Sequence, residues 1–253
     1  MLNVDDLKIS LITVAYNAEN TIGRCVDSVI AQNYKNIEYI IIDGGSTDNT
    51  IQIIKSYKEG VSVFISEPDA GIYDAMNKGI KLATGDIVGT LNADDFFAAD
   101  DVLSTVATAF AQQNADITYG DLDYVDADDK VFRKWRSTAY KPGMFNYGWM
   151  PPHPTFYCKR IFFSTFGDYS LEFGTAADYE FMLRLMHLNG LNAVYIKKVL
   201  VKMKIGGISN KSFNNRVQGS LFDLKAMRNN GIWLPVVTIL LKPLRKITQY
   251  FFN

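Results

Sequence analysis

Cysteine is scarce in this 253-residue sequence, which contains only Cys25 and Cys158. Two isolated cysteines provide neither a disulfide framework nor the spacing of a zinc site, so a reducing compartment fits best. The longest hydrophobic run, Ile232–Leu241, has ten residues and contains a proline and a threonine, whereas a membrane crossing requires roughly 20 residues. Met1–Lys8 is polar and acidic, so we expect no signal peptide and a cytoplasmic protein.

Net charge is also small, at −1, but the charges are unevenly distributed along the chain. Residues 181–253 contain twelve Lys or Arg and one acid, Asp223, which gives +11. The totals of 26 basic and 27 acidic residues then leave 14 and 26 for residues 1–180, or −12. With 48% hydrophobic residues the chain can bury a full core, so we expect one α/β domain with an appended, basic C-terminal segment.

Short apolar segments alternate with helical periodicity in the first part of the chain. This alternation predicts a mostly parallel, Rossmann-like sheet with helices on both faces. The predicted strands are Ile9–Val14, Ile37–Ile42, Val61–Ile65 and Ile87–Leu91. Polar clusters follow these strands directly, so they gather at the carboxyl edge of the sheet, where open α/β folds bind ligands.

Beyond Ala115 the pattern changes to short strands, predicted over 117–119, 122–125 and 131–135, with a turn at Asp126–Asp129. Helical spacing returns near Asp178, which is placed where a helix N-cap is expected. The last residues, Ile232–Phe252, combine aromatic and aliphatic side chains with lysines and an arginine, a composition typical of a membrane-interfacial segment. A tail packed on the globular domain remains the alternative interpretation.

Two polar clusters are candidates for chemistry, and each has a structural alternative. Asn92-Ala93-Asp94-Asp95 offers hard oxygen ligands for Mg²⁺ or Mn²⁺ on a diphosphate, but its acids also suit a helix cap. Asp43–Asp48 offers a carboxylate for a base edge and glycines for close approach, or simply a glycine turn with a cap. Neither G-x-x-x-x-G-K nor G-x-G-x-x-G is present, which argues against NTPases and dinucleotide oxidoreductases.

In combination, several stretches resemble the family 2 glycosyltransferases, over about Lys8 to Asn210. They are Thr13–Glu19, Asp43–Asp48, Asp69–Gly79, Gly85-Asp86, Leu91–Asp95, His153–Phe156, Ala177–Glu180 and Gly206–Ser209. The resemblance implies a GT-A fold and an inverting transfer of a hexose from a UDP-sugar. It is greatest to small bacterial enzymes that build O-antigen, capsule or exopolysaccharide. The Q-x-x-R-W signature of processive synthases is absent after Asp178, so single-sugar transfer is expected.

The resemblance also implies a role for each matching residue. Asp178 matches the general base, and Asp94 and Asn92 match the ligands of a Mn²⁺ or Mg²⁺ cofactor. The implied donor-binding residues are Thr13, Tyr16, Glu19, Asp43, Asp86, Asn92, Ala93 and Asp94. Asp95 is expected to contact donor or acceptor, and His153 and Trp149 to line the acceptor pocket, although core packing is an equal expectation for Trp149.

This sequence departs from the family pattern at four positions. Ala15 replaces the usual proline, Gly44 a second acid, and Asn92 the first Asp of D-x-D, while Ala177 replaces a Glu that often precedes the base. Asn92 removes one anionic ligand, although its carbonyl can still coordinate a metal. These departures motivate a non-enzymatic alternative, a degenerate nucleotide-sugar-binding partner. A sugar-nucleotidyltransferase is a further alternative, but Tyr16–Glu19 lacks the basic, glycine-rich loop that it requires.

The expected organisation is a catalytic domain over 1–210, with a nucleotide-sugar half over 1–114 and an acceptor half over 115–210. Residues 211–253 form a helical, basic segment that is expected to dock on an anionic membrane surface at the inner face of the cell membrane. The expected partners are a UDP-sugar donor and a carbohydrate or polyprenyl-diphosphate-linked acceptor. No nucleic acid is expected.

Overall fold

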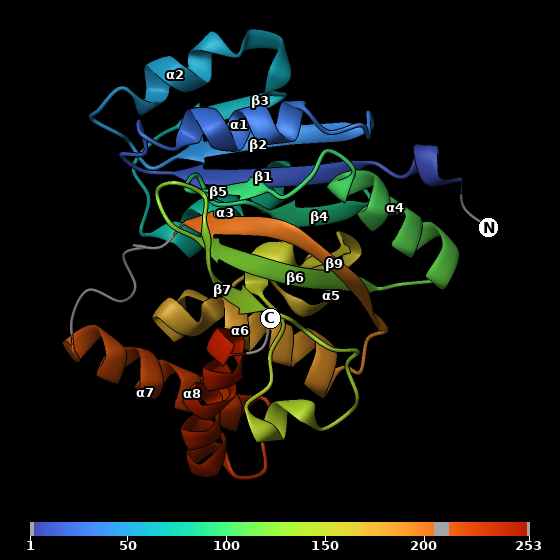
Figure 1. Ribbon diagram of the computed structural model, residues 1–253, viewed down its shortest axis with the longest axis vertical. Helices are drawn as coiled ribbons and strands as arrows, with labels where there is room; N and C mark the ends of the chain where they lie inside the picture. Colours follow the sequence, from blue (N-terminus) through green and yellow to red (C-terminus); the bar gives the residue numbers. More distant parts are fainter. Residues whose placement is uncertain (1–2, 205–212, 252–253) are drawn as a thin grey trace.

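The computed structural model describes residues 3–204 and 213–251 and is built on one continuous mixed sheet (Figure 1). The strand order is β3-β2-β1-β4-β8-β6-β9-β5, and β7 pairs with β6 beside this path. The strands at one side are all parallel: β1 Ile9–Ala15, β2 Ile37–Asp43, β3 Val63–Ser66 and β4 Ile87–Thr90. This half of the fold confirms the four strands predicted from the sequence.

Helices cover both faces of the parallel half, and each face has its own apolar core. On one face lie α1 Ile22–Ile30, α2 Thr50–Ser56 and α4 Val102–Gln113, and on the other α3 Ile72–Leu82. Residues of β1 alternate between the two cores, with Leu11 in the first and Ile12 in the second. A strand buried on both faces reads as a continuous apolar run, which explains why the strand pattern was clear in the sequence.

The second half of the sheet is mixed in direction. It consists of β5 Asp95–Phe97, β6 Ile117–Val125, β7 Val131–Trp135, β8 Tyr157–Lys159 and β9 Ala193–Lys204. The two strands predicted over 117–119 and 122–125 are one strand, β6, with a register irregularity at Gly120. A Cβ at Gly120 would meet the Leu200 side chain at 2.6 Å, so the β6–β9 pair requires glycine there. The predicted turn at Asp126–Asp129 joins β6 to β7.

Short helical segments and the C-terminal helices pack on the second half of the sheet. The longer helices are α5 Ile161–Phe166, α6 Ala177–Met182, α7 Phe213–Asn229 and α8 Pro235–Phe251, and α6 continues into the π-helix η6 Leu183–Leu188. The 3₁₀ turns are η1 Val4–Asp6, η2 Lys58–Gly60, η3 Met144–Tyr147, η4 His153–Thr155 and η5 Leu171–Ala176. Figure 1 shows α7 and α8 at the opposite end of the molecule from α2.

The C-terminal segment is helical, as expected, and packs against the rest of the chain. α7 contacts η5 and α6, and α8 contacts η3 and β7. Within residues 3–204 and 213–251, no helix combines the length and apolar character that a membrane crossing demands. The sheet runs without interruption across residue 115, and the division into donor and acceptor halves there stays a prediction.

Candidate active site

Two loops at the carboxyl edge of the parallel strands are bound tightly to each other. Asn17 has a positive φ of 48°, and its Oδ1 accepts a hydrogen bond from the Thr47 amide at 2.9 Å. Its own amide donates to Ser46 Oγ at 2.8 Å. Glu19 Oε2 accepts from the Asn49 amide at 3.0 Å and from Asn49 Nδ2 at 2.8 Å. Because these side chains hold the loop between β2 and α2, the loop is rigid before any ligand binds. Tyr16 stays 61% exposed above it.

Asp43 and its neighbouring glycines shape the floor of this edge. The Asp43 carboxylate is fully buried and accepts from the amides of Gly45 and Ser46 at 3.1 and 3.0 Å, and from Ser66 Oγ at 2.7 Å. Ser46 Oγ is bonded to it as well. These bonds hold the Asp43 carboxylate in place, and its expected contact with a base edge stays a prediction. Gly44 lies against the Asp69 carboxylate, so an acid from another loop fills the space of the acid missing at 44.

The loop after β4 carries oxygen atoms that the described residues leave unpartnered. Asn92 Nδ2 donates to Asp95 Oδ2 at 3.3 Å, whereas Asn92 Oδ1 and Asp95 Oδ1 are buried without a hydrogen bond among the described residues. Burial raises the pKa of Asp94. Burial and the charge of Asp94 together raise the pKa of Asp95 well above its usual range. Buried oxygens without donors are costly unless a ligand or cation completes them.

A cavity of about 240 Å³ brings the Asn92 loop together with residues of the second half of the sheet and of α6. Its polar lining comes from Asn92, His153, Thr175 and Asp178. The rest of the lining is apolar or aromatic, from Ile72, Tyr73, Met76, Leu122, Tyr124, Trp135, Met150, Pro154 and Met203. Thus Asn92 and Asp178, which are far apart in the sequence, face one enclosed space.

Asp178 lies in the first turn of α6 rather than at its N-cap, which is Ala176. Asp178 Oδ1 accepts from the Tyr179 amide at 2.7 Å, and the side chain of Tyr73 lines the same cavity. Burial, and then the charge of Asp178, raise the pKa of Tyr73 well above its usual range, so the phenol remains a donor. The sequence predicted Asp178 at the N-cap of this helix. That prediction is wrong, because the helix begins at Ala177 and its N-cap is Ala176.

His153 is the second titratable group in the cavity. Its Nε2 is 2.9 Å from the hydroxyl of Tyr169. Burial lowers the pKa of His153 below its usual value, and the nearby Asp178 carboxylate opposes this shift only in part. His153 is therefore a neutral imidazole near pH 7, which suits a hydrogen-bonding wall better than a charged group.

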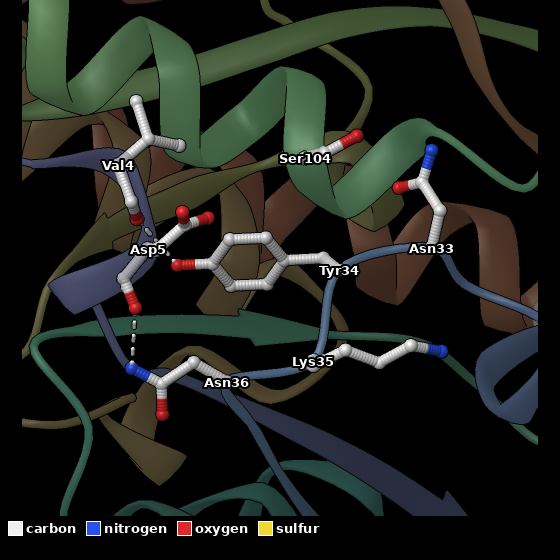
Figure 2. Close-up of a pocket in the computed structure, with 7 residues that line it drawn as sticks. All are labelled: Val4, Asp5, Asn33, Tyr34, Lys35, Asn36 and Ser104. Carbon is white, nitrogen blue, oxygen red and sulfur yellow. Dashed lines mark hydrogen bonds between the residues drawn. The ribbon is translucent and has the colours of Figure 1, made fainter.

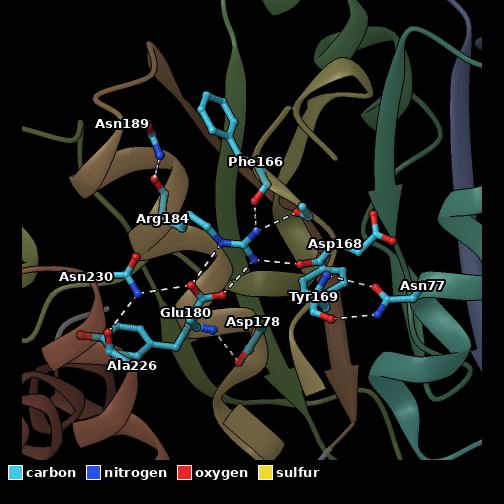
Figure 3. A network of polar contacts seen from close by, with 12 residues as sticks. Asn77, Phe166, Asp168, Tyr169, Asp178, Glu180, Arg184, Asn189, Ala226 and Asn230 are labelled. Atoms are coloured by element: carbon cyan, nitrogen blue, oxygen red, sulfur yellow. Dashed lines mark hydrogen bonds and ion pairs between the residues drawn. The ribbon is translucent and has the colours of Figure 1, made fainter. Parts of the chain in front are cut away.

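A polar network fixes the helix that carries Asp178 (Figure 3). Arg184 donates from Nε and Nη2 to the Glu180 carboxylate at 3.1 and 2.9 Å, and its Nη atoms also bind the carbonyls of Phe166, Gly167 and Asp168. Asn230 Nδ2, just beyond the end of α7, donates to Glu180 Oε1 at 3.3 Å. The backbone of Tyr169, the residue after Asp168, forms two hydrogen bonds with the Asn77 side chain of α3. The network thus connects α3, α6 and α7 around the cavity.

Several expected site residues lie elsewhere. Asp86 precedes β4, so it lies at the amino edge of the sheet, where its carboxylate accepts from the Lys8 amide. Thr13 is fully buried, with its hydroxyl 3.0 Å from that of Tyr39. Ala93 and Asp95 are only 6% and 1% exposed, below the loop surface.

Trp149 packs in the core as well. Its ring contacts those of Tyr119, Tyr140 and Phe145, so the aromatic side chain does not line the cavity. Glu19 is occupied by Asn49, as described above. Among the expected residues, the structure brings Asn92, His153 and Asp178 together in the cavity. The motif stretch Gly206–Ser209 lies outside the described residues.

Three residues near the site had no role assigned from the sequence, although Asp69 and Tyr73 lie in the motif stretch Asp69–Gly79. Tyr73 lines the cavity with Asp178, Tyr169 contacts His153, and Asp69 stands beside Gly44. Tyr73 had one usable signal, because it is three residues from Met76 and thus on the same helical face. Tyr169 had none, since its loop carries no motif and its role depends on tertiary contacts.

A larger cavity of about 710 Å³ lies at the amino edge of the sheet, and Figure 2 shows its lining. The polar groups there bind one another: Tyr34 Oη donates to the carbonyl of Val4 at 2.7 Å, and Asn36 Nδ2 to that of Asp5 at 3.2 Å. None of the expected site residues lines it. Size alone therefore does not identify the functional site here.

The fold is of the GT-A type. Residues 10–176 match the family described as Glycosyl transferase family 2, and the chain belongs to that family. It is 32% identical over 221 residues to an uncharacterized glycosyltransferase of Mycobacterium tuberculosis, covering 84% of this chain and 81% of the relative. A PGL/p-HBAD biosynthesis glycosyltransferase of Mycobacterium bovis is 30% identical over 212 residues, covering 79% and 78%. The chain is a glycosyltransferase.

Solved structures share the fold at low sequence identity. Staphylococcus aureus TarS 1-349 in complex with UDP has a TM-score of 0.71 at 17% identity, over 96% of this chain and 72% of that one. A mannosyltransferase from Pyrobaculum calidifontis in complex with GDP-Man and Mn²⁺ has a TM-score of 0.66 at 15% identity, over 94% and 72%. The chain spans 39% of a longer TarS structure.

Proposed function

We propose that this enzyme transfers one hexose from a UDP-sugar to a carbohydrate acceptor with inversion, and that Asp178 is its general base. The observation that carries the proposal is the shared cavity of Asn92 and Asp178. A donor diphosphate at the Asn92 loop and an acceptor hydroxyl at Asp178 would meet in this cavity, on opposite sides of the anomeric carbon. An inverting displacement requires that arrangement.

The proton transfer follows from the surroundings of Asp178. The acceptor oxygen forms a bond to the anomeric carbon as the bond to UDP breaks, and UDP leaves with the electron pair. The hydroxyl proton passes to the Asp178 carboxylate. Tyr73 lines the same cavity, where burial and the charge of Asp178 keep its phenol protonated, so the carboxylate is the group that takes the proton. Neutral His153 can accept or donate a hydrogen bond to the acceptor without competing for the proton.

A divalent cation, Mn²⁺ or Mg²⁺, fits the donor set of the Asn92 loop in part. Asn92 Oδ1 is a buried oxygen without a partner, and Asp94 adds a half-buried carboxylate. The described residues contain no group of three His, Cys, Asp or Glu side chains that would enclose an ion, so diphosphate oxygens must complete its shell. When bound, the ion would neutralise the charge of the leaving diphosphate. Asn92 and Asp94 would hold it.

The acceptor in this proposal is a carbohydrate on a polyprenyl diphosphate, used for a bacterial surface polysaccharide at the inner face of the cell membrane. Relatives named as PGL/p-HBAD biosynthesis glycosyltransferases support a role in the synthesis of a surface glycan. The cavity supports an acceptor with a large apolar face, because nine of its lining side chains are apolar or aromatic.

The test measures transfer and donor hydrolysis with UDP-glucose, UDP-galactose and their N-acetyl forms, each with and without Mn²⁺. Synthetic lipid-linked and soluble glycoside acceptors are supplied in parallel, and the product anomer is read by NMR. We expect Mn²⁺-stimulated transfer with inversion at the anomeric carbon. A retained configuration would exclude Asp178 as the base of a direct displacement. UDP binding without any turnover would favour the degenerate binding partner instead.

A further inference from the structure

The outward face of α8 is apolar, the reverse of an ordinary surface helix. The side chains on this face and at the start of the helix are large and mostly exposed: Trp233 85%, Leu234 56%, Val236 58%, Val237 47%, Leu240 65% and Leu244 56%. At 100° per residue, the three positions 237, 240 and 244 form one stripe along α8, and Trp233 lies two residues before the helix begins. Tyr147 of η3, 63% exposed, belongs to the segment that α8 packs against.

The polar side of α8 is turned toward the protein and holds the helix in place. Thr238 Oγ1 donates to the Asn146 carbonyl at 2.6 Å, and Lys242 Nζ is 2.7 Å from Asp223 Oδ2 of α7. Arg245 Nε donates to the Tyr147 carbonyl at 2.7 Å. Gly148, with φ of 75°, is so close that a Cβ there would lie 2.8 Å from the Lys242 amide nitrogen. The apolar face therefore points outward because its opposite side is anchored, and no rotation of the helix alone would bury it.

We propose that the outward face of α8 inserts into the interfacial layer of an anionic bilayer. Charge decides between a bilayer and a second copy of the chain. Residues 213–251 contain six Lys or Arg and a single acid, Asp223, so a second copy seated on α8 would bring two segments of net charge +5 together without a net counter-charge. An anionic leaflet supplies that counter-charge, and a tryptophan is favoured at the depth of the headgroups.

This docking differs in mechanism from a purely polybasic attachment. Lys242 and Arg245 bind protein groups, so apolar insertion supplies most of the binding and the cations add a preference for anionic lipid. α8 also packs on α7, which contacts η5, and η5 carries Thr175 of the cavity lining. The docked face is thus attached to the wall of the acceptor site. The purpose of this docking rests on the proposed lipid-linked acceptor. That acceptor would be presented beside the docked face.

The experiment uses the full chain and vesicles of phosphatidylcholine, with and without phosphatidylglycerol, at low and high salt. Flotation is compared for the wild type, for L240D/L244D, and for I161D/L188D as a matched control. Ile161 and Leu188 are 60% and 58% exposed but belong to α5 and η6. We expect the wild type and control to float in both salts, with more protein on anionic vesicles, and the α8 variant to lose about tenfold or more of its bound fraction.

Tryptophan fluorescence and the oligomeric state give independent readouts. Vesicles should shift the emission of the wild type to the blue, and W233F should lack the shift. Equal flotation of L240D/L244D and the wild type would overturn the proposal, as would a wild-type dimer that L240D/L244D converts to monomers without any vesicle binding. Transfer to a soluble acceptor should be equal in the wild type and the α8 variant. A loss of transfer in both would count against the proposed function and leave the docking result intact.

Discussion

The two edges of the sheet contrast in how their buried polar groups are satisfied. At the amino edge, Glu38 is only 8% exposed and accepts bonds from Ser10 Oγ, Lys8 Nζ and the amide and hydroxyl of Thr84. At the carboxyl edge, Asp43 is bonded as fully, but Asn92 and Asp95 each keep a buried oxygen that no described residue satisfies.

Both edges have a cavity, and the amino-edge one is the larger. A fully bonded carboxylate contributes to the stability of the fold, whereas an unsatisfied one is retained at a cost to stability. Buried oxygens without hydrogen-bond partners therefore indicate the candidate site at the carboxyl edge better than the volume of its cavity does. Substitutions at the two edges should therefore have different consequences, and four experiments test this difference.

The largest effect is expected for Asp178→Asn at the cavity. The amide keeps the size of the side chain but cannot take a proton from the acceptor hydroxyl. Transfer should fall by a factor of about 10² to 10⁴ while UDP-sugar affinity stays near wild type. Initial rates and calorimetry measure the two quantities, and Asp223→Asn, on α7, is the control. Near-normal transfer in Asp178→Asn would mean that another group is the base.

A large loss of stability is expected for Arg184→Met. The substitution leaves Glu180, which is 5% exposed, as a buried charge whose only remaining donor among the interactions described above is Asn230. Removing one partner of a buried ion pair typically costs about 3 to 5 kcal/mol in free energy of unfolding. Urea unfolding measures this cost. Arg184→Met/Glu180→Met is the control, since removing both charges should recover part of the loss, and a single variant as stable as wild type would refute the structural role of the network.

A smaller, binding-specific effect is expected for Asp94→Ala. Mn²⁺-dependent UDP affinity should fall by about 10- to 100-fold. Removing a residue that only hydrogen-bonds a metal ligand already lowers metal affinity by about this factor. Metal-free UDP binding should change little, and the thermal midpoint should not fall, because burial disfavours the Asp94 charge that is removed. Calorimetry with and without Mn²⁺ separates the two affinities. Equal losses with and without metal would place Asp94 outside the cation site.

The smallest effect is expected at the amino edge, for Glu38→Gln. Burial alone would raise the pKa of Glu38, but its bonds from Ser10, Thr84 and Lys8 lower this pKa to about 2. A lowered pKa gives stability that is present above the unfolded value, near 4.5, and is lost as pH falls toward 2. The variant should lose about 1 to 2 kcal/mol in free energy of unfolding at pH 7, and less with decreasing pH. Transfer activity should remain near wild type, and a pH-independent difference would contradict the ionic contribution.

Much of the nucleotide-sugar half could be predicted from the sequence. Strands such as Ile9–Ala15 and Ile37–Asp43 are buried on both faces, so local composition reveals them without knowledge of the contacts. The short strands β5 and β8 were not predicted, because three residues carry no periodicity and exist only through their pairing with β9, β4 and β6. β6 was predicted as two separate strands, although the strand is continuous from Ile117 to Val125 and only its register with β9 shifts at Gly120.

The sequence by itself determined the glycosyltransferase family and the parallel strands and indicated Asn92 and Asp178 as candidate site residues, because motifs and buried strands are local features. Only the tertiary structure decided that Asp43, Thr13 and Trp149 are internal, that Asp86 lies at the opposite edge, that Tyr73 shares the cavity of Asp178, and that Tyr169 contacts His153. It also decided the direction of α8. Hydrophobic periodicity indicates that a helix has an apolar side, but the bonds of Thr238 and Lys242 to distant residues determine which side faces the protein.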